Sequence, residues 1–226
     1  MKRFFYHSIL SLFLLVMFCI TGGGNLAKAQ SYQLVKSPDG LVSGDKYLIV
    51  SKDKGDALST EQGKSNRGAQ VVSFAQDGSI DAATLNSNVA IIVLTEEGTD
   101  LWSFQVTNGS KTGELYAAGT SSKSNLFKTS TSTSWLDYRA SISIATTGEA
   151  TIVFENQKNT SGLSRTLQRN TSNALYSCYA SASQSPVYLY HYVAPTGATD
   201  PNISYSPSSF TIAANGTLTQ PTLNNP

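Results

Sequence analysis

Apolar and polar residues alternate over short stretches through most of the chain after residue 30. A period of two, rich in Val, Ile, Tyr, Phe and Thr, predicts β-strands with one buried face. Turn-forming residues separate these stretches, and Asn108-Gly109 is the sharpest signal for a tight turn. The predicted strands are Gln33–Lys36, Lys46–Val50, Gln70–Phe74, Val89–Leu94, Leu101–Val106, Glu114–Ala118, Ala140–Ile144, Ala150–Phe154, Arg165–Gln168, Ala174–Tyr179 and Val187–Val193.

Helical periodicity is nearly absent from the same region. No long window repeats apolar residues at a spacing of 3.6 between capping residues, so we expect one short helix, at Asp81–Leu85. Many short strands separated by turns are typical of a sandwich or a barrel. We therefore expect a single all-β, β-barrel-like domain over residues 30–194.

Internal similarity bears on the form of this domain. Three segments share an order of apolar pair, polar turn and apolar return: Tyr47–Leu58, Leu115–Leu126 and Leu167–Leu175. A repeat architecture leaves this kind of signal in a sequence. The starts of the segments are unevenly spaced, so an irregular barrel and a β-trefoil-like fold both stay open.

The pattern changes at Pro195–Pro201, where two prolines enclose small residues. Such a composition predicts a linker. Beyond it, Ile203–Tyr205 and Ser209–Ile212 resemble two further strands. The remaining residues are far fewer than the roughly 100 of an immunoglobulin-like sandwich. We expect residues 202–226 to be the start of an incomplete Ig-like domain, with docking of this segment on the first domain as the alternative.

The first 29 residues read as a secretory signal peptide. Lys2 and Arg3 form a basic start, Ile9–Ile20 is almost wholly apolar, and Ala27-Lys28-Ala29 matches a small-residue cleavage site. The apolar run is short for a membrane-spanning helix. We expect export through the Sec pathway and a secreted or cell-surface protein that begins at Gln30, with no membrane insertion after cleavage.

Composition and charge narrow the partners. The chain is 40% hydrophobic and only 14% charged, against about 25% charged in an average protein. Loss of the three basic residues in the signal changes the net charge from +1 to −2. Nucleic acids and anionic membranes attract dense basic patches, so neither is an expected partner. We expect a monomer.

Cysteine usage excludes an intrachain disulfide after cleavage. Cys19 lies within the signal, and Phe18 before it disfavours lipidation, which needs a small residue there. Cys178 is then the single thiol. Its place in a predicted strand, beside Tyr176 on the same face, indicates a buried and unreactive side chain.

Catalytic signals are weak. His191 is the single histidine after the signal, and we expect it on an apolar strand face with a backbone partner. The nucleophile pattern G-x-S-x-G is absent from the sequence. Glu155 follows a predicted strand and is the most suitable carboxylate for glycoside hydrolysis, which needs a second carboxylate that the sequence does not identify. No catalytic residue is assigned.

Metal and cofactor signals are similarly weak. One histidine and one cysteine are too few for a zinc site. The acid pairs Asp53/Asp56 and Asp77/Asp81 come nearest to a calcium loop but lack its spacing, which favours solvated turn residues. We expect neither a metal nor a cofactor.

Aromatic residues supply the candidate ligand surface. Trp102 shares a strand face with two apolar residues, which predicts a core position. Tyr188, Tyr190 and Tyr192 alternate along Val187–Val193 and would line one face of that strand. Such rings can stack on sugars, and Trp135 could join them. A second packed face of the sheet is the alternative for the tyrosines, and a core position is the alternative for Trp135.

Several short motifs resemble a β-rich module that is found in secreted or cell-surface multidomain proteins of the Bacteroidetes type. The motifs are Gly44–Val50, Asn66-Arg67, Trp102-Ser103-Phe104, Leu115–Ala118, Ser177–Ser181 and Val187–Tyr190. The resemblance covers about residues 32–193 as a loose pattern, and the tail is similar to the opening strands of an Ig-like repeat. It implies an extracellular accessory role and carries no catalytic residues.

Together these signals favour a non-catalytic binding module for a glycan or another extracellular polymer. A hydrolase domain and a structural spacer are the alternatives. Because the net charge is low, we expect binding to depend weakly on salt.

Overall fold

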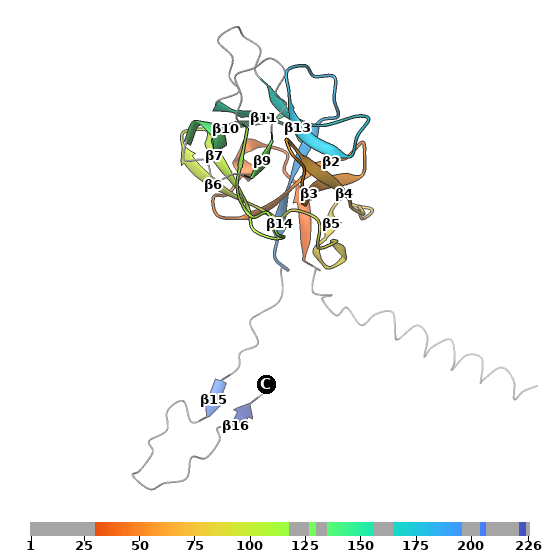
Figure 1. The fold of residues 1–226 in the computed structure, drawn as a ribbon. Coiled ribbons are helices and arrows are strands. Elements are labelled where there is room, and N and C mark those ends of the chain that lie inside the picture. Colours follow the sequence, from red (N-terminus) through yellow and green to blue (C-terminus); the bar gives the residue numbers. More distant parts are fainter. Residues whose placement is uncertain are drawn as a thin grey trace, which may run out of the picture. The chain divides into compact units, whose positions relative to one another are not determined.

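A computed structural model describes residues 30–117, 127–129, 135–155, 165–195, 204–206 and 222–224 (Figure 1). One compact unit spans Ala29–Ala194. The regular secondary structure of its described part consists almost entirely of strands, which confirms the all-β prediction. The strands are β1 (Ser31–Leu34), β2 (Lys46–Ser51), β3 (Asp56–Gln62), β4 (Arg67–Val71), β5 (Ile80–Asp81), β6 (Ile92–Gly98), β7 (Leu101–Val106), β8 (Gly113–Tyr116), β9 (Lys128–Thr129), β10 (Ala140–Ile144), β11 (Glu149–Phe154), β12 (Thr166–Arg169), β13 (Leu175–Tyr179) and β14 (Val187–Val193).

Six of these strands close into an antiparallel ring. The order around it is β2, β6, β7, β10, β11 and β14, and pairing of β14 with β2 joins the two ends. Leu189 lies opposite Ile49 at this closure. The pairing of β7 with β10 and that of β11 with β14 each involve few residues, so the ring is irregular. Closure leaves the ring strands without a free edge.

Six of the remaining strands form three hairpins, each of which lies in the chain between two successive ring strands. The β3–β4 hairpin lies between β2 and β6, β8–β9 between β7 and β10, and β12–β13 between β11 and β14. The chain thus repeats one four-strand unit three times, starting at Lys46, Leu101 and Glu149. Six ring strands with three hairpins are the topology of a β-trefoil, which decides between the two forms that the sequence left open. β1 extends the sheet beside β14, and β5 pairs with β1.

Both faces of β2 and β14 are buried. Ile49 and Leu189 belong to the larger hydrophobic cluster, to which the ring strands and hairpins contribute. Leu48 and Tyr190 belong to a smaller cluster, which also holds Ile80 of β5. Two-sided burial explains why β2 is apolar over four consecutive positions, Tyr47–Val50. Each fully buried large apolar side chain contributes roughly 1.5–3 kcal/mol to stability.

The sequence located most of these strands. The bounds of β7, β10 and β14 match the predicted bounds, whereas the strand predicted at Gln70–Phe74 occurs at Arg67–Val71. β3 was missed because three of its polar residues, Asp56, Ser59 and Thr60, are buried and so break the expected alternation. The short strands β5 and β9 were missed as well.

Short helical turns connect some strands. The helix predicted at Asp81–Leu85 is the 3₁₀ helix η2 (Ala82–Thr84), in which the Asp81 carboxylate accepts a hydrogen bond from the Ala83 N–H at 2.9 Å. A second 3₁₀ helix, η1, spans Pro38–Gly40, and the single turn α2 spans Trp135–Tyr138. No helix among the described residues is long and apolar enough to cross a membrane.

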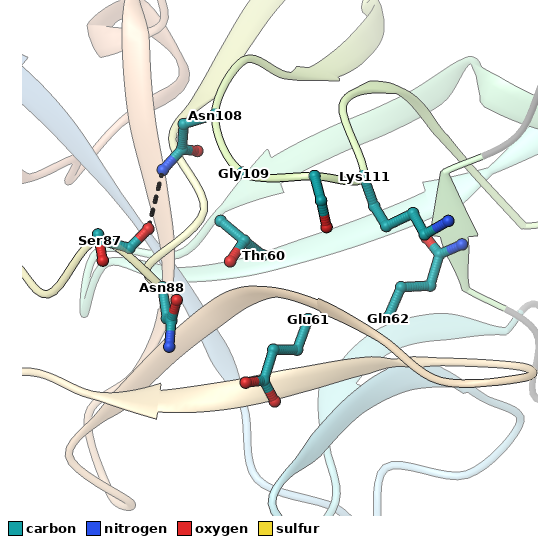
Figure 2. Close-up of a pocket in the computed structure, with 9 residues that line it drawn as sticks. Thr60, Glu61, Gln62, Ser87, Asn88, Asn108, Gly109 and Lys111 are labelled. Atoms are coloured by element: carbon teal, nitrogen blue, oxygen red, sulfur yellow. Dashed lines mark hydrogen bonds between the residues drawn. The ribbon is translucent and has the colours of Figure 1, made fainter.

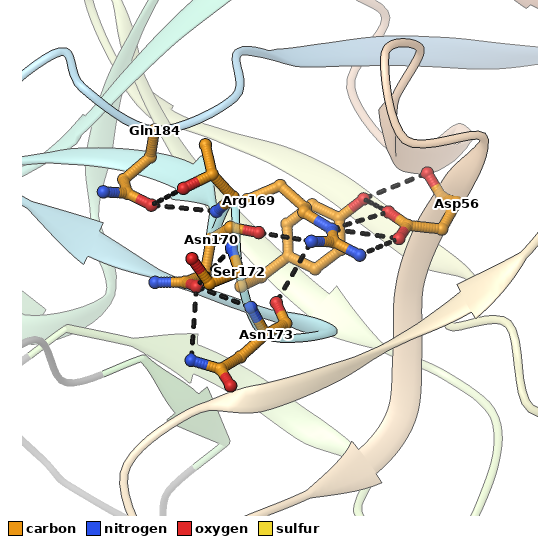
Figure 3. A network of polar contacts seen from close by, with 8 residues as sticks. Asp56, Arg169, Asn170, Ser172, Asn173 and Gln184 are labelled. Atoms are coloured by element: carbon orange, nitrogen blue, oxygen red, sulfur yellow. Dashed lines mark hydrogen bonds and ion pairs between the residues drawn. The ribbon is translucent and has the colours of Figure 1, made fainter.

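A buried ion pair joins two of the hairpins. The Arg169 Nε and Nη2 atoms of β12 donate to Asp56 Oδ2 of β3 at 2.9 and 2.5 Å (Figure 3). The Tyr176 hydroxyl of β13 donates to Asp56 Oδ1 at 3.0 Å. Because Asp56 and Arg169 are only 4% and 8% exposed, each charge depends on the other for compensation.

The other unit of the chain is described only at two strands. β15 (Ser204–Ser206) pairs with β16 (Thr222–Asn224) in antiparallel fashion. The strand predicted at Ser209–Ile212 lies outside the described residues, as do the signal segment 1–29 and all of the predicted linker except Pro195. The predictions for the signal and the Ig-like start stay predictions.

We predict that Arg169→Met lowers the free energy of unfolding by about 3–5 kcal/mol, because it leaves the Asp56 carboxylate buried without its partner. Urea denaturation measures the change. Lys54→Met, at an exposed lysine of the β2–β3 connection, is the control and should cost little. A loss below about 1 kcal/mol for Arg169→Met, the range of exposed pairs, would contradict the role given to this pair.

Candidate functional site

A polar cleft of about 820 Å³ opens beside the β3–β4 hairpin (Figure 2). Three separate segments form it: the second half of β3, the residues just before β6, and the connection from β7 to β8. Its lining residues carry hydroxyl, amide, carboxylate and ammonium groups and no aromatic ring. They are Thr60, Glu61, Gln62, Ser87, Asn88, Asn108, Gly109, Ser110 and Lys111.

Asn108 fixes two of the three segments against each other. Its Oδ1 accepts a hydrogen bond from the Ile91 N–H at 2.7 Å, and its Nδ2 donates to the Val89 carbonyl at 2.8 Å. The Thr60 N–H donates to the Asn88 carbonyl at 2.8 Å, which ties the segment before β6 to β3. The predicted Asn108-Gly109 turn is therefore part of a longer connection, and the asparagine side chain holds that connection in place.

Gly109 allows the backbone to approach β3 closely. Its φ is 80°, a left-handed conformation that favours glycine. A Cβ atom at this position would lie 2.5 Å from the Thr60 Cβ, closer than real Cβ contacts allow. The wall of the cleft is therefore formed by bare backbone at this point.

Arg67 supports one end of the cleft from inside the protein. Its side chain is fully buried, and its Nε and Nη2 atoms donate to the Ser59 and Thr60 carbonyls at 3.0 and 2.9 Å. Its Nη1 donates to the Lys111 carbonyl at 3.2 Å and to Gln62 Oε1 at 3.3 Å. Burial lowers the pKa of Arg67 to about 10, so the guanidinium stays charged at neutral pH.

Gln62 is also occupied by the fold. Its Oε1 accepts hydrogen bonds from the Thr129 N–H at 2.7 Å and the Thr129 hydroxyl at 2.8 Å. In contrast, the side chains of five lining residues are exposed and make no hydrogen bond or ion pair to another described residue. These five, the free cleft residues, are Glu61, Ser87, Asn88, Ser110 and Lys111.

The predicted tyrosine surface is placed differently. Tyr188, Tyr190 and Tyr192 share one face of β14, as the alternation indicates, but that face packs against the smaller hydrophobic cluster. Tyr190 is 1% exposed, with its ring 6.0 Å from that of Phe74. Burial raises its pKa to about 12. Tyr190 is thus a packing residue, and a row of three exposed rings is not formed.

The two flanking tyrosines are half-buried. Lys52 Nζ lies 5.0 Å from the centre of the Tyr188 ring, and Lys46 Nζ lies 5.8 Å from that of Tyr192. Neither tyrosine lines the cleft. Trp135 begins α2, and its side chain lies outside the described residues.

The candidate catalytic residues have structural partners. His191 Nε2 lies 2.7 Å from Asp45 Oδ2, so the expectation of a backbone partner was wrong for this nitrogen. The Glu155 Oε2 accepts from Arg139 Nη2 at 2.9 Å. Cys178 is fully buried, as predicted, and burial raises the pKa of its thiol. Trp102 also lies in the core, as predicted.

The expectation of solvated turn residues is wrong for Asp56, which is buried and paired with a distant arginine. Asp56 pairs with Arg169, Asp77 Oδ1 accepts from the Ser79 N–H at 2.9 Å, and Asp81 caps η2. Asp53 is exposed. Within the described ranges, no group of three or more His, Cys, Asp or Glu side chains could hold a metal ion.

The carboxyl group of Glu114 lies in an environment that disfavours its charge, which the sequence analysis did not predict. Glu114 Oε2 is buried without a hydrogen-bond partner among the described residues. Desolvation raises the pKa of Glu114, and the negative charge of Glu97 raises it further. The Glu97 Oε1 accepts a hydrogen bond from the Ser103 hydroxyl at 2.8 Å. A glutamate on a strand carries no sequence signal for this environment.

We predict that Gly109→Ala destabilises the protein more than Gly78→Ala. Both glycines have φ near 80°, but the Gly78 position has open space around it. Gly78→Ala should cost about 1–2 kcal/mol for the left-handed conformation, and Gly109→Ala should cost about 1–3 kcal/mol more for the clash. Urea denaturation measures both. Equal costs would show that the connection moves freely away from β3.

We predict that Glu114→Gln stabilises the protein at neutral pH. The folded state raises the pKa of Glu114 above its ordinary value, so the unfolded state loses this proton first and stability falls as the pH rises through the raised pKa. The gain should vanish below about pH 4, where a free glutamate is protonated in both states. Thermal melts across this range test the prediction, with the exposed Glu96→Gln as control. A gain that is independent of pH would contradict it.

Comparisons with known proteins identify no family. No family model matches the chain, and no curated protein matches it. Among solved structures, the crystal structure of the designed three-fold symmetric protein ThreeFoil is 18% identical, with 64% of this chain and 96% of that chain covered and a TM-score of 0.43. An apo crystal form of the BEL β-trefoil is 11% identical, with 70% and 100% covered and a TM-score of 0.44. The trefoil topology given above rests on the strand pairing of the chain itself.

Proposed function

We propose that this chain is an exported, non-catalytic binding module whose ligand is a glycan of the extracellular space. The observation that carries the proposal is the polar cleft, with its five free cleft residues on a fixed backbone. The secretory pattern of residues 1–29 supports the location. The low content of charged residues is in keeping with a surface that meets neutral, hydroxylated polymers.

The chemistry of the free cleft residues suits a sugar. Hydroxyl groups on Ser87 and Ser110 both donate and accept hydrogen bonds, as does the amide of Asn88. A sugar presents the same dual groups around its ring. Polar groups of this kind fix the orientation of a ligand and provide specificity.

The rigid frame of the cleft favours binding. Asn108 is fixed by its contacts with Ile91 and Val89, and Gly109 packs directly on Thr60. A ligand therefore does not have to order these segments when it binds. Preorganisation of this kind increases affinity because less conformational freedom is lost.

Structural partners support the choice of a non-catalytic role over a hydrolase. The carboxylate of Glu155 contacts Arg139, and the Cys178 thiol has no access to solvent. His191 stacks on Tyr47, with 4.9 Å between ring centres, and contacts Asp45. Glu155, Cys178 and His191 are therefore explained by their contacts within the folded protein, without a catalytic role.

A glycan array followed by titration of the best ligand tests the proposal. We expect the protein to bind, and we expect Asn88→Ala and Ser110→Ala each to weaken binding about fivefold, since one hydrogen bond contributes roughly 1 kcal/mol. Both side chains are exposed, so the melting temperature should stay unchanged. Gln76→Ala, at an exposed amide away from the cleft, is the control.

Two results would contradict the proposal. Failure of the protein to bind any glycan would favour the spacer alternative. Binding that is unchanged by the cleft variants but reduced by Tyr188→Ala or Tyr192→Ala would move the site to the half-buried tyrosines of β14.

A further inference from the structure

One end of the cleft has more positive than negative charge. Figure 2 shows Lys111 and Gln62 at this end and Ser87 and Asn88 at the other. The lining contains one ammonium, on Lys111, and one carboxylate, on Glu61. These two charges alone would cancel, so any charge buried behind the lining residues decides the sign of the net charge at the cleft.

The buried guanidinium of Arg67 lies directly behind this end. Its Nη1 donates to the Lys111 carbonyl at 3.2 Å and to Gln62 Oε1 at 3.3 Å, and both acceptors belong to lining residues. Its other partners are the Ser59 and Thr60 carbonyls and the Thr129 hydroxyl. All of these partners are neutral, and within the described part of the chain no carboxylate pairs with Arg67.

Arg169, another buried arginine of the described residues, shows the contrast. Arg169 has the Asp56 carboxylate within 2.5 Å, so its charge is compensated at close range. The Arg67 guanidinium donates its hydrogen bonds to neutral oxygen atoms, which satisfy its N–H groups but do not cancel its positive charge. A buried charge is poorly screened by salt and solvent, so its field extends into an adjoining cleft. Arg67 and Lys111 therefore act together at one end.

We infer that the cleft selects glycans with an anionic group, of which uronic acids are the simplest class. The ligand carboxylate would lie at the Lys111 end, and sugar hydroxyls would lie toward Asn88. This inference rests on the proposed function. It reverses the expectation from net charge, because binding to a local excess of positive charge weakens as salt is added.

Oligogalacturonate and its methyl ester are the probes, because they share a sugar skeleton and differ in the charge of each carboxyl group. Titration calorimetry in about 0.1 M and about 1 M salt compares conditions with Debye lengths of about 10 Å and about 3 Å. We expect the acid to bind about fivefold more tightly than the ester at low salt, which is the upper end of the range for one exposed ion pair. At high salt this advantage should largely disappear.

Variants then assign the effect to the cleft. Lys111→Gln should weaken binding of the acid about fivefold and leave the ester unchanged. Glu61→Gln should strengthen binding of the acid, since it removes a like charge. Lys36→Gln, at an exposed lysine outside the cleft, makes the same change in net charge and should leave both affinities unaltered.

The outcomes separate this inference from the proposed function. Equal affinity for acid and ester, or an equal loss from Lys36→Gln and Lys111→Gln, would overturn the selection of anionic ligands and leave a glycan site in place. Binding of neutral glycans alone, lost in Asn88→Ala, would do the same. If the protein binds neither probe and no glycan of the array, both the selection of anionic ligands and the proposed glycan-binding function are overturned.

Discussion

The pairing of β14 with β2 is the constraint on which the rest of the structure depends. It joins the last strand of the third four-strand repeat to the first strand of the first repeat, and so closes the ring. With the ring closed, one face of both strands turns into the larger core and the other face needs a second apolar cover, which β1 and β5 provide. The three hairpins then have fixed places between ring strands. The cleft exists because the first hairpin is held beside the β7–β8 connection of the second unit.

A strand could be predicted from the sequence where its apolar residues alternate regularly, and not where buried polar residues interrupt that pattern. β7 and β14 were located from their sequences because apolar residues on at least one face repeat every second position. β3 was not, since Ser59 and Thr60 are buried beside the apolar Ala57 and Leu58, so burial does not follow the alternation of polar and apolar residues. The face of Tyr190 was identified, but its burial depends on β1 and β5, whose positions are set by tertiary contacts. A strand pattern gives the direction of a side chain and not what lies above it.

The cleft was hidden from the sequence for a different reason. Its three segments are far apart in the chain, and each is an ordinary polar stretch that reads as a turn. The Asn108-Gly109 turn was the one part of the cleft that the sequence indicated. These two residues hold the backbone of the cleft wall in place and are not among the free cleft residues. The different surroundings of Arg67 and Arg169 could not be predicted from the sequence either. Whether an arginine meets a carboxylate, as Arg169 does, or only carbonyl oxygens, as Arg67 does, is decided by the packing of hairpins from different units.

The pairing of β1 with β14 has a mechanical consequence. Ser31 lies opposite Val193 in an antiparallel ladder, so the first and last strands of this unit have their outer ends side by side. Antiparallel partners are only about 4.5–5.5 Å apart at the Cα atoms. Tension applied through the flanking segments would therefore load one rung of the ladder at a time, as in a zipper, and would not shear all rungs together. The polypeptide therefore enters and leaves this domain at the same point, and the domain adds little to the distance between its two flanking segments.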